Sequence, residues 1–193
     1  MTDSLLTDAY WSERYRNQQT GWDTGMPTTP LKEYTDQLKD TSLHILIPGC
    51  GNAHEAFYLL EKGFQHITLL DISAELVSQL SAKMAGTPVK VIHADFFHHQ
   101  GQYDLILEQT FFCALDPAQR NDYVLHMYDL LKPGGKLVGV LFNRDFEGGP
   151  PFGGHITEYQ KLFGSRFSHC LIAPCYNSIP PRKDSEAFII IQK

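Results

Sequence analysis

A strand, a glycine turn, a helix and a second strand ending in an acid follow one another within residues 43–71. The apolar run 43–47 is broken by Gly49 and Gly51, and the second apolar run ends at Asp71, twenty residues after Gly51. Glycines let a loop take positive φ and approach a ligand closely. A carboxylate at the end of the next strand can accept hydrogen bonds from both hydroxyls of a ribose. The order therefore predicts a βαβ unit that holds an adenosine-containing cofactor.

The position three residues after Gly51 helps to distinguish between cofactors. A dinucleotide site usually has a third glycine there, which lets the helix pack closely and its N-terminus receive the pyrophosphate. In this chain the position is occupied by His54. Because S-adenosylmethionine carries no phosphate, the missing glycine favours this methyl donor over NAD. An NAD-linked oxidoreductase stays open as an alternative, since the βαβ turn also fits it.

The composition is that of a soluble globular protein. The 193 residues suit one domain, with 42% hydrophobic and 20% charged residues. A net charge of −6 without a Lys/Arg cluster argues against nucleic acid, and no apolar run approaches the roughly 20 residues of a membrane helix. The polar N-terminus is no secretory signal, and the four cysteines lack C-x-x-C spacing. We expect a cytoplasmic protein with a small-molecule substrate, and a monomer because no extra apolar helix or heptad appears.

Strand and helix patterns alternate along the chain, which predicts a doubly wound, mostly parallel sheet. Residues 1–40 form a predicted N-terminal helical cap, and residues 41–193 a Rossmann-like core of the same domain. The predicted strands are 43–47, 67–70, 89–93, 103–107, 136–142, 166–173 and 186–192. The predicted helices are 8–18, 30–40, one ending at Gly63, 74–84 with Ser73 as N-cap, 116–131 and 157–163.

The last two predicted strands are joined by residues 174–185, which are poor in helical pattern. A parallel connection needs a crossover, usually a helix, whereas antiparallel strands can be joined by a loop. The sequence therefore predicts a terminal hairpin and a reversed last strand.

Several motifs resemble, in order, the cofactor motifs of class I S-adenosylmethionine-dependent methyltransferases: IPGCG, LDIS, HADFF, YDLI and LLKPGGKL. More specifically, the chain resembles the thiopurine S-methyltransferase superfamily and, within it, the thiol/halide methyltransferase branch. The discriminating stretches are WSERYRNQQTGWDTGMPTTP, FFCAL, GPPF and IPPRK. The resemblance implies a seven-stranded sheet with an antiparallel last strand and helices on both faces. It also implies methyl transfer to a small thiol, thiolate or related soft nucleophile.

The same resemblance implies a set of cofactor-binding residues. Asp71 would take the ribose hydroxyls, Asp95 the adenine amino group, and Trp11 and Trp22 would surround the sulfonium, whose charge is attracted to aromatic faces. Phe96 would offer its backbone N–H and apolar contact to the adenine. The full set is Trp11, Tyr15, Trp22, Gly49, Gly51, Asp71, Asp95, Phe96 and Gln109.

The acceptor pocket needs no catalytic triad or metal, because a thiolate or halide is already a good nucleophile. The protein must align the reactants and exclude water. The candidate pocket residues are Trp22, Phe111, Phe112, Phe152 and Arg182, with Pro150 and Pro151 beside them.

The chain departs from the family pattern at three positions of these predicted sites. Tyr15 and Gln109 stand where the plant branch has tryptophan and tyrosine, and Phe152 where some halide-active relatives have tyrosine. A second alternative, a binding module for S-adenosylmethionine without catalysis, is motivated by Gln109 and Phe152.

Other residues that attract notice have simpler interpretations. His93, His98 and His99 lack a matching carboxylate or cysteine spacing, so we expect no metal site. Cys50 and Cys113 read as packed thiols. Glu108 ends the fourth predicted strand and is expected to shape the pocket or meet the cofactor's amino group.

Overall fold

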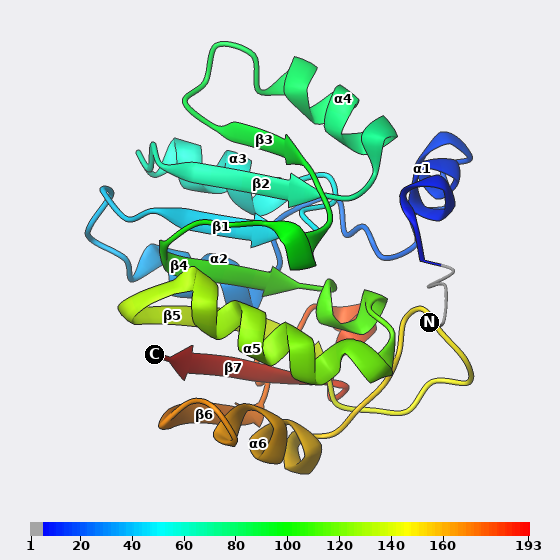
Figure 1. Ribbon diagram of the computed structural model, residues 1–193, viewed down its shortest axis with the longest axis vertical. Helices are drawn as coiled ribbons and strands as arrows, with labels where there is room; N and C mark the ends of the chain where they lie inside the picture. The colour runs from blue at the N-terminus through cyan, green and yellow to red at the C-terminus, as the bar shows by residue number, and fades with distance from the viewer. Residues whose placement is uncertain (1–5) are drawn as a thin grey trace.

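The computed structural model describes residues 6–193 and has a seven-stranded sheet at its centre (Figure 1). The first five residues of the predicted cap lie outside the described residues. The strands are β1 (Ile45–Pro48), β2 (Ile67–Asp71), β3 (Lys90–His93), β4 (Tyr103–Gln109), β5 (Leu131–Phe142), β6 (His169–Pro174) and β7 (Glu186–Gln192). The helices are α1 (Asp8–Arg16), α2 (Thr29–Asp36), α3 (His54–Glu61), α4 (Ala74–Lys83), α5 (Arg120–Leu130) and α6 (Ile156–Gly164), with 3-10 turns η1 (Phe96–His98), η2 (Phe112–Ala114), η3 (Pro117–Gln119) and η4 (Pro180–Arg182).

The strand order is β3-β2-β1-β4-β5-β7-β6. The first five strands in this order pair in parallel, and β7 pairs antiparallel with both β5 and β6. In Figure 1 the arrow of β7 points opposite to those of β1–β4. The predicted terminal hairpin and reversed last strand are therefore confirmed.

Apolar residues cover both faces of the sheet, because parallel strands are buried on two sides. On one face, Tyr123 of α5 and Phe163 of α6 pack with Ile106 and its neighbours. On the other, Leu31, Leu59 and Leu76 of α2, α3 and α4 pack against alternate residues of the same strands. The alternation along β1 shows this division, since Ile45 and Ile47 face one core and Leu46 the other.

Two boundaries near β5 differ from the prediction. The helix expected over 116–131 is divided into η3 and α5. Asp116 caps the 3-10 turn η3 by accepting a hydrogen bond from Ala118 N–H (2.8 Å). The KPGG segment belongs to β5, which begins at Leu131 and not at 136. The register with β4 shifts between Tyr103 and Leu105, so the glycines form an irregularity within the strand. Helix α2 also ends at Asp36, earlier than the predicted residue 40.

The N-terminal segment and the long loop after β5 gather at the carboxyl ends of the parallel strands (Figure 1). Helix α1 is attached to α4 there: Asp8 accepts hydrogen bonds from Ala74 N–H (2.9 Å) and from the Ser12 hydroxyl (2.6 Å). The Asp8 carboxylate thus occupies the positive end of α4. Within residues 6–193, no helix is long and apolar enough to cross a membrane.

Candidate active site

A cavity of about 700 Å³ opens at the carboxyl ends of β1, β2 and β4. Ligands of open α/β sheets bind at this edge. All nine residues expected at the cofactor line this one cavity: Trp11, Tyr15, Trp22, Gly49, Gly51, Asp71, Asp95, Phe96 and Gln109. The structure therefore brings together residues that are as far apart as 11 and 109 in the sequence.

The glycine turn after β1 has the left-handed backbone that its sequence predicts. Gly49 has φ 55° and Gly51 has φ 52°. A Cβ on Gly49 would lie 2.7 Å from Phe111 Cγ, whereas one on Gly51 would meet nothing closer than the Tyr15 hydroxyl at 3.8 Å. Gly49 is thus required by conformation and by close packing, and Gly51 by conformation alone.

Asp71 ends β2 inside the cavity wall with 8% of its surface exposed. Its Oδ1 accepts a hydrogen bond from Ser73 N–H (2.9 Å). Burial raises the pKa of Asp71 to about 6, and the backbone donors of Ser73 and Gly51 oppose that rise. A buried carboxylate beside two glycines of positive φ fits the ribose of S-adenosylmethionine, which would replace lost water with two hydroxyl donors.

Asp95 and Phe96 follow β3 on the far side of the cavity. Asp95 Oδ1 caps η1 through Phe97 N–H (2.9 Å), and its other oxygen faces the His98 ring at 3.5 Å. Phe96 is buried, and its ring meets that of Phe111 at 5.1 Å between centroids. This pair could hold the polar edge and one face of an adenine ring.

Three aromatic side chains of the N-terminal segment meet over the cavity. The Trp22 ring contacts Trp11 edge-on at 5.6 Å and Tyr15 at 5.8 Å. Burial raises the pKa of Tyr15 well above its ordinary value, so its hydroxyl stays neutral. These rings provide the apolar, electron-rich surface that a sulfonium favours.

Polar contacts that the sequence did not reveal attach this segment to the core. Asp23 accepts from the Asn52 amide and pairs with the His54 ring (2.7 Å), so the residue in place of the third glycine holds the segment over the cavity. Thr28 donates its hydroxyl to Gln109 Oε1 (2.8 Å). The adjacency of Asp23 to Trp22 is the one sequence signal that could have identified this contact.

Glu55 is a second acid of the cavity that sequence reasoning missed. It begins α3 beside His54, and its Oε1 accepts from Thr28 N–H at 3.4 Å. Burial raises the pKa of Glu55. A half-buried acid at this place could accept from the amino group of a cofactor's amino-acid moiety.

Three of the five residues expected at the acceptor line this cavity. Trp22, Phe111 and Arg182 line the cavity, as do Pro150 and Pro151. Phe112 does not: it is 1% exposed and packs in the core, with ring centroids 5.0 Å from Tyr123 and 5.6 Å from Tyr159.

Phe152 also lies outside the cavity lining. Its backbone N–H donates to Cys113 O (2.7 Å), so it anchors the loop after β5, while the prolines before it face the cavity. Phe142 and Phe146 line the wall instead, with ring centroids 4.9 Å apart. The sequence does not indicate that these two side chains face the cavity, because their orientation depends on the path of the loop after β5.

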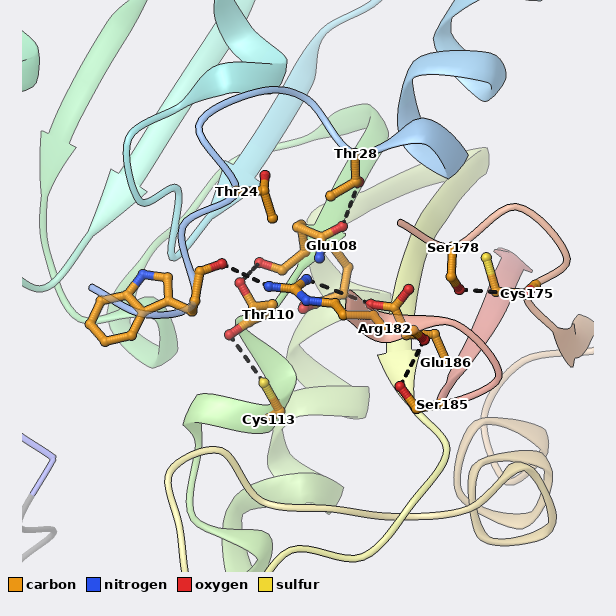
Figure 2. A network of polar contacts seen from close by, with 12 residues as sticks. Thr24, Thr28, Glu108, Thr110, Cys113, Cys175, Ser178, Arg182, Ser185 and Glu186 are labelled. Atoms are coloured by element: carbon orange, nitrogen blue, oxygen red, sulfur yellow. Dashed lines mark hydrogen bonds and ion pairs between the residues drawn. The ribbon is translucent and has the colours of Figure 1, made fainter. Parts of the chain in front are cut away.

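Arg182 connects the C-terminal loop to the N-terminal segment (Figure 2). Its Nη2 donates to Trp22 O (2.7 Å), and its Nη1 lies 3.5 Å from Glu186 Oε1. Burial raises the pKa of Glu186, and the Arg182 charge opposes that rise. Arg182 Nη1 and Gln109 Nε2 are buried and have no hydrogen-bond partner within residues 6–193. Gln109 Nε2 is therefore a donor available for a ligand, whereas Arg182 Nη1 faces the Glu186 carboxylate.

The three histidines have separate partners and do not converge. His93 Nε2 contacts Ile72 O (2.9 Å), His98 lies near Asp95 and His99 contacts the Tyr103 hydroxyl (2.7 Å). In the part of the chain that the structure describes, no group of three or more His, Cys, Asp or Glu could hold a metal. All four cysteines are free thiols, and burial raises the pKa of Cys113 to about 12.

Comparison with known protein families and sequences agrees with the site. The sequence model of the family thiopurine S-methyltransferase (TPMT) matches residues 6–178. A probable thiol methyltransferase 2 of Arabidopsis thaliana is 31% identical over 184 residues, which cover 91% of this chain and 81% of that protein. Thiocyanate methyltransferase 1 of the same plant is 27% identical over the same length, with the same shares. A thiopurine S-methyltransferase of Acinetobacter baylyi is 23% identical over 183 residues, or 82% of this chain and 84% of that one.

Solved structures share the fold. A Burkholderia thailandensis 1,6-didemethyltoxoflavin-N1-methyltransferase, solved with S-adenosylhomocysteine, superposes with a TM-score of 0.73 at 16% identity, covering 97% of this chain and 87% of that one. A TehB-like S-adenosylmethionine-dependent methyltransferase from Corynebacterium glutamicum gives 0.68 at 14% identity, with 96% and 97% covered. The predicted class I methyltransferase fold is confirmed.

Proposed function

The chain belongs to the thiopurine S-methyltransferase family and is a methyltransferase that uses S-adenosylmethionine, and we propose that it methylates the sulfur of a small thiol or a related soft anion. The names of the relatives support this acceptor class, since one is a probable thiol methyltransferase and another a thiocyanate methyltransferase. The finer choice among thiol, sulfide, thiopurine and halide depends on the acceptor side of the cavity.

The single observation that carries the proposal is the chemistry of that side. From Gln109 onward, the described lining residues include aromatic rings, prolines and two arginines, Arg144 and Arg182, and no carboxylate or histidine. The acids and the histidine nearest to Trp22 already have partners, since Asp23 pairs with His54 and Glu55 accepts from Thr28 N–H. Methylation of a hydroxyl or a protonated amine needs a group to take the proton. A thiolate or halide arrives without that proton, so a wall without a base suits it.

We assign the cofactor to the side built from the first three strands. Bound S-adenosylmethionine supplies a methyl group on a positively charged sulfur. Asp71 accepts from the ribose hydroxyls, Asp95 and Phe96 hold the adenine, and Trp11 and Trp22 surround the sulfonium.

The remaining work of the protein is alignment and the exclusion of water. Phe111, Phe142 and Phe146 form an apolar wall in which a soft nucleophile sheds its hydration shell. Arg182 attracts an anionic acceptor and at the same time holds the carbonyl of Trp22, which keeps the aromatic cover in place. Orientation of this kind can lower a barrier by about 7–11 kcal/mol at best.

We further propose that the protein works in the cytoplasm as a monomer, without a nucleic-acid partner. The four free thiols support a reducing compartment, and the net charge of −6 supports a small-molecule partner over a polyanion.

Incubation with labelled S-adenosylmethionine and a panel of hydrosulfide, organic thiols, thiopurine and iodide tests the acceptor. We expect turnover with at least one sulfur nucleophile and a ranking that gives the physiological class. S-adenosylhomocysteine binding without turnover on any member would favour a module without catalysis. Faster methylation of bulk RNA than of small thiols would refute the proposal.

A further inference from the structure

Glu108 is a fully buried acid beside the site that does not line the cavity. It is the next-to-last residue of β4 and is 0% exposed. Its Oε1 accepts from the backbone N–H groups of Phe111 (2.8 Å) and Phe112 (2.9 Å), and its Oε2 accepts from the Tyr123 hydroxyl (2.7 Å). Both carboxylate oxygens therefore already accept hydrogen bonds from donors within the protein.

Strand β5 is shaped to admit this side chain. Gly139 pairs with Glu108 across the parallel ladder, and a Cβ there would lie 2.6 Å from Glu108 O and 2.9 Å from its Cγ. A glycine inside a strand weakens it, and close approach of another group is a usual reason for one. The glycine thus lets β5 pass close to the backbone and the first side-chain carbons of Glu108.

The backbone between Glu108 and Phe111 is held in a conformation that needs support. Thr110 has φ 59°, and a β-branched residue is a genuine outlier in this left-handed region. Glu108 compensates by capturing two consecutive N–H groups after the turn, which would otherwise be buried without partners.

The turn decides what faces the acceptor. Phe111 lines the cavity and contacts Gly49, whereas Phe112 enters the core against Tyr123. The next carbonyl, that of Cys113, accepts from Phe152 N–H (2.7 Å) and so fixes the loop whose prolines form another part of the wall.

We propose that Glu108 is a positioning residue for methyl transfer: its buried carboxylate fixes the turn over residues 110–112 and thereby sets the shape of the acceptor pocket. The inference rests on the proposed function, because the pocket it shapes is assigned to the acceptor. Glu108 does not touch either reactant and acts through Phe111 and the loop after β5.

The carboxylate must be ionised to accept three donors at once. Protonation would make one oxygen a donor, so the Tyr123 hydroxyl would have to reverse and accept, as it must against any neutral group at this position. The groups that face Glu108 are Tyr123 of α5, Cys113 of η2 and Tyr159 of α6, all neutral at physiological pH. Burial raises the pKa of Glu108 to about 7, so its ionisation changes within an accessible range.

Glu108→Gln and Glu108→Ala separate positioning from folding. The glutamine oxygen can still accept from both backbone N–H groups, while its amide meets the Tyr123 hydroxyl, which can rotate to accept. In Glu108→Ala we expect the acceptor KM to rise about tenfold or more, with the Kd of S-adenosylhomocysteine changed less than about twofold. We expect Glu108→Gln to restore the acceptor KM to within about threefold of the natural protein.

The pH profile gives a readout that a purely structural role would not move. We take the ratio of kcat/KM for the acceptor in the natural protein to that in Glu108→Gln, because acceptor ionisation cancels in this ratio. It should fall from at most about threefold toward one as the pH drops below about 7, since the natural protein then carries a neutral group as the variant does. If Glu108→Ala does not fold, the pH profile of this ratio still tests the inference.

An unchanged acceptor KM in folded Glu108→Ala, or a ratio that is flat between about pH 6 and 8, would overturn the inference. Hydrogen exchange at the amides of Phe111 and Phe112 tests it without any acceptor. These amides should be protected in the natural protein and in Glu108→Gln and exchange faster in Glu108→Ala. Equal exchange in all three refutes the inference. Absence of turnover in the natural protein, with the expected exchange pattern, refutes the proposed function alone.

Discussion

Removal of the Asp71 carboxylate tests the register of the whole cofactor site. The side chain is 8% exposed and accepts a hydrogen bond from Ser73 N–H (2.9 Å), and the backbone donor of Gly51 also faces it. Two ribose hydroxyls donating to a charged group would contribute roughly 1.5–3 kcal/mol each at most, and water entering the gap offsets part of this. We expect Asp71→Ala to weaken S-adenosylhomocysteine binding by about 2–3 kcal/mol, or about 30–150-fold in Kd.

Asp71→Asn is the matched control. Its oxygen can keep the bond to Ser73 N–H, so the N-cap residue of α4 stays in place, but one acceptor becomes a donor. Its loss of affinity should be about half that of Asp71→Ala on a kcal/mol scale. Calorimetric titration measures both, and a thermal melt shows that each variant is folded. A folded Asp71→Ala variant with an unchanged Kd would mean that the ribose is held elsewhere.

The pH dependence of the same titration follows from burial. The pKa of Asp71 is raised from 3.8 to about 6 in the folded protein, so the carboxyl is protonated below that pH. The raised pKa means that folding is favoured as the pH falls through 6, because the protein no longer buries a charge. Ligand affinity should do the opposite and fall by up to about tenfold per pH unit below 6. A pH-independent Kd between 5 and 8 would contradict the assigned role of this carboxylate.

Four further changes test the packing around the cavity and its N-terminal cover. Gly49→Ala should destabilise the fold by about 2–4 kcal/mol, because the new Cβ meets Phe111, whereas Gly51→Ala should cost about 1 kcal/mol for its positive φ alone. Denaturant unfolding measures both variants, and equal midpoints would contradict the packing argument. Arg120→Met should cost about 1–3 kcal/mol in denaturant unfolding, because Arg120 holds the loop after β5 through Gly153 O (2.6 Å), and an unchanged midpoint would show that loop to be independently held. Deletion of residues 1–24 should leave a folded sheet without turnover, and S-adenosylhomocysteine should protect this segment of the intact chain from proteolysis; equal cleavage with and without saturating ligand would count against a closing cover.

The cofactor side could be predicted from the sequence because its signals are local. Gly49, Gly51 and Asp71 belong to one βαβ unit, and the spacing between them is fixed by the length of one helix and one strand. The C-terminal hairpin could be predicted from local signals too. The loop before the last strand is poor in helical pattern, and a parallel connection would need a crossover helix. These predictions needed no knowledge of which distant segments meet.

The acceptor side could be predicted only in part, because its geometry depends on contacts across the chain. Phe111 and Phe112 are neighbours of the same chemical type, yet one lines the cavity and the other enters the core. Which of the two enters the core depends on the left-handed backbone of Thr110, and this conformation cannot be predicted from a threonine in the sequence. The bond from Arg182 to Trp22 O joins residues 160 positions apart, and no local pattern contains it.

The two sides of the cavity therefore differ in how they can change. On the cofactor side, strand ends and a glycine turn fix the groups, so a substitution there disturbs the sheet itself. On the acceptor side, the wall is carried by the turn at Glu108, by Arg182 and by the loop after β5, each attached through a few hydrogen bonds. Substitution of the lining residue Phe146 changes a side chain and leaves those attachments in place, whereas Phe142 also packs against the Arg182 guanidinium, 5.7 Å from its ring centroid. Acceptor preference can thus change at Phe146 while the affinity for S-adenosylmethionine is retained.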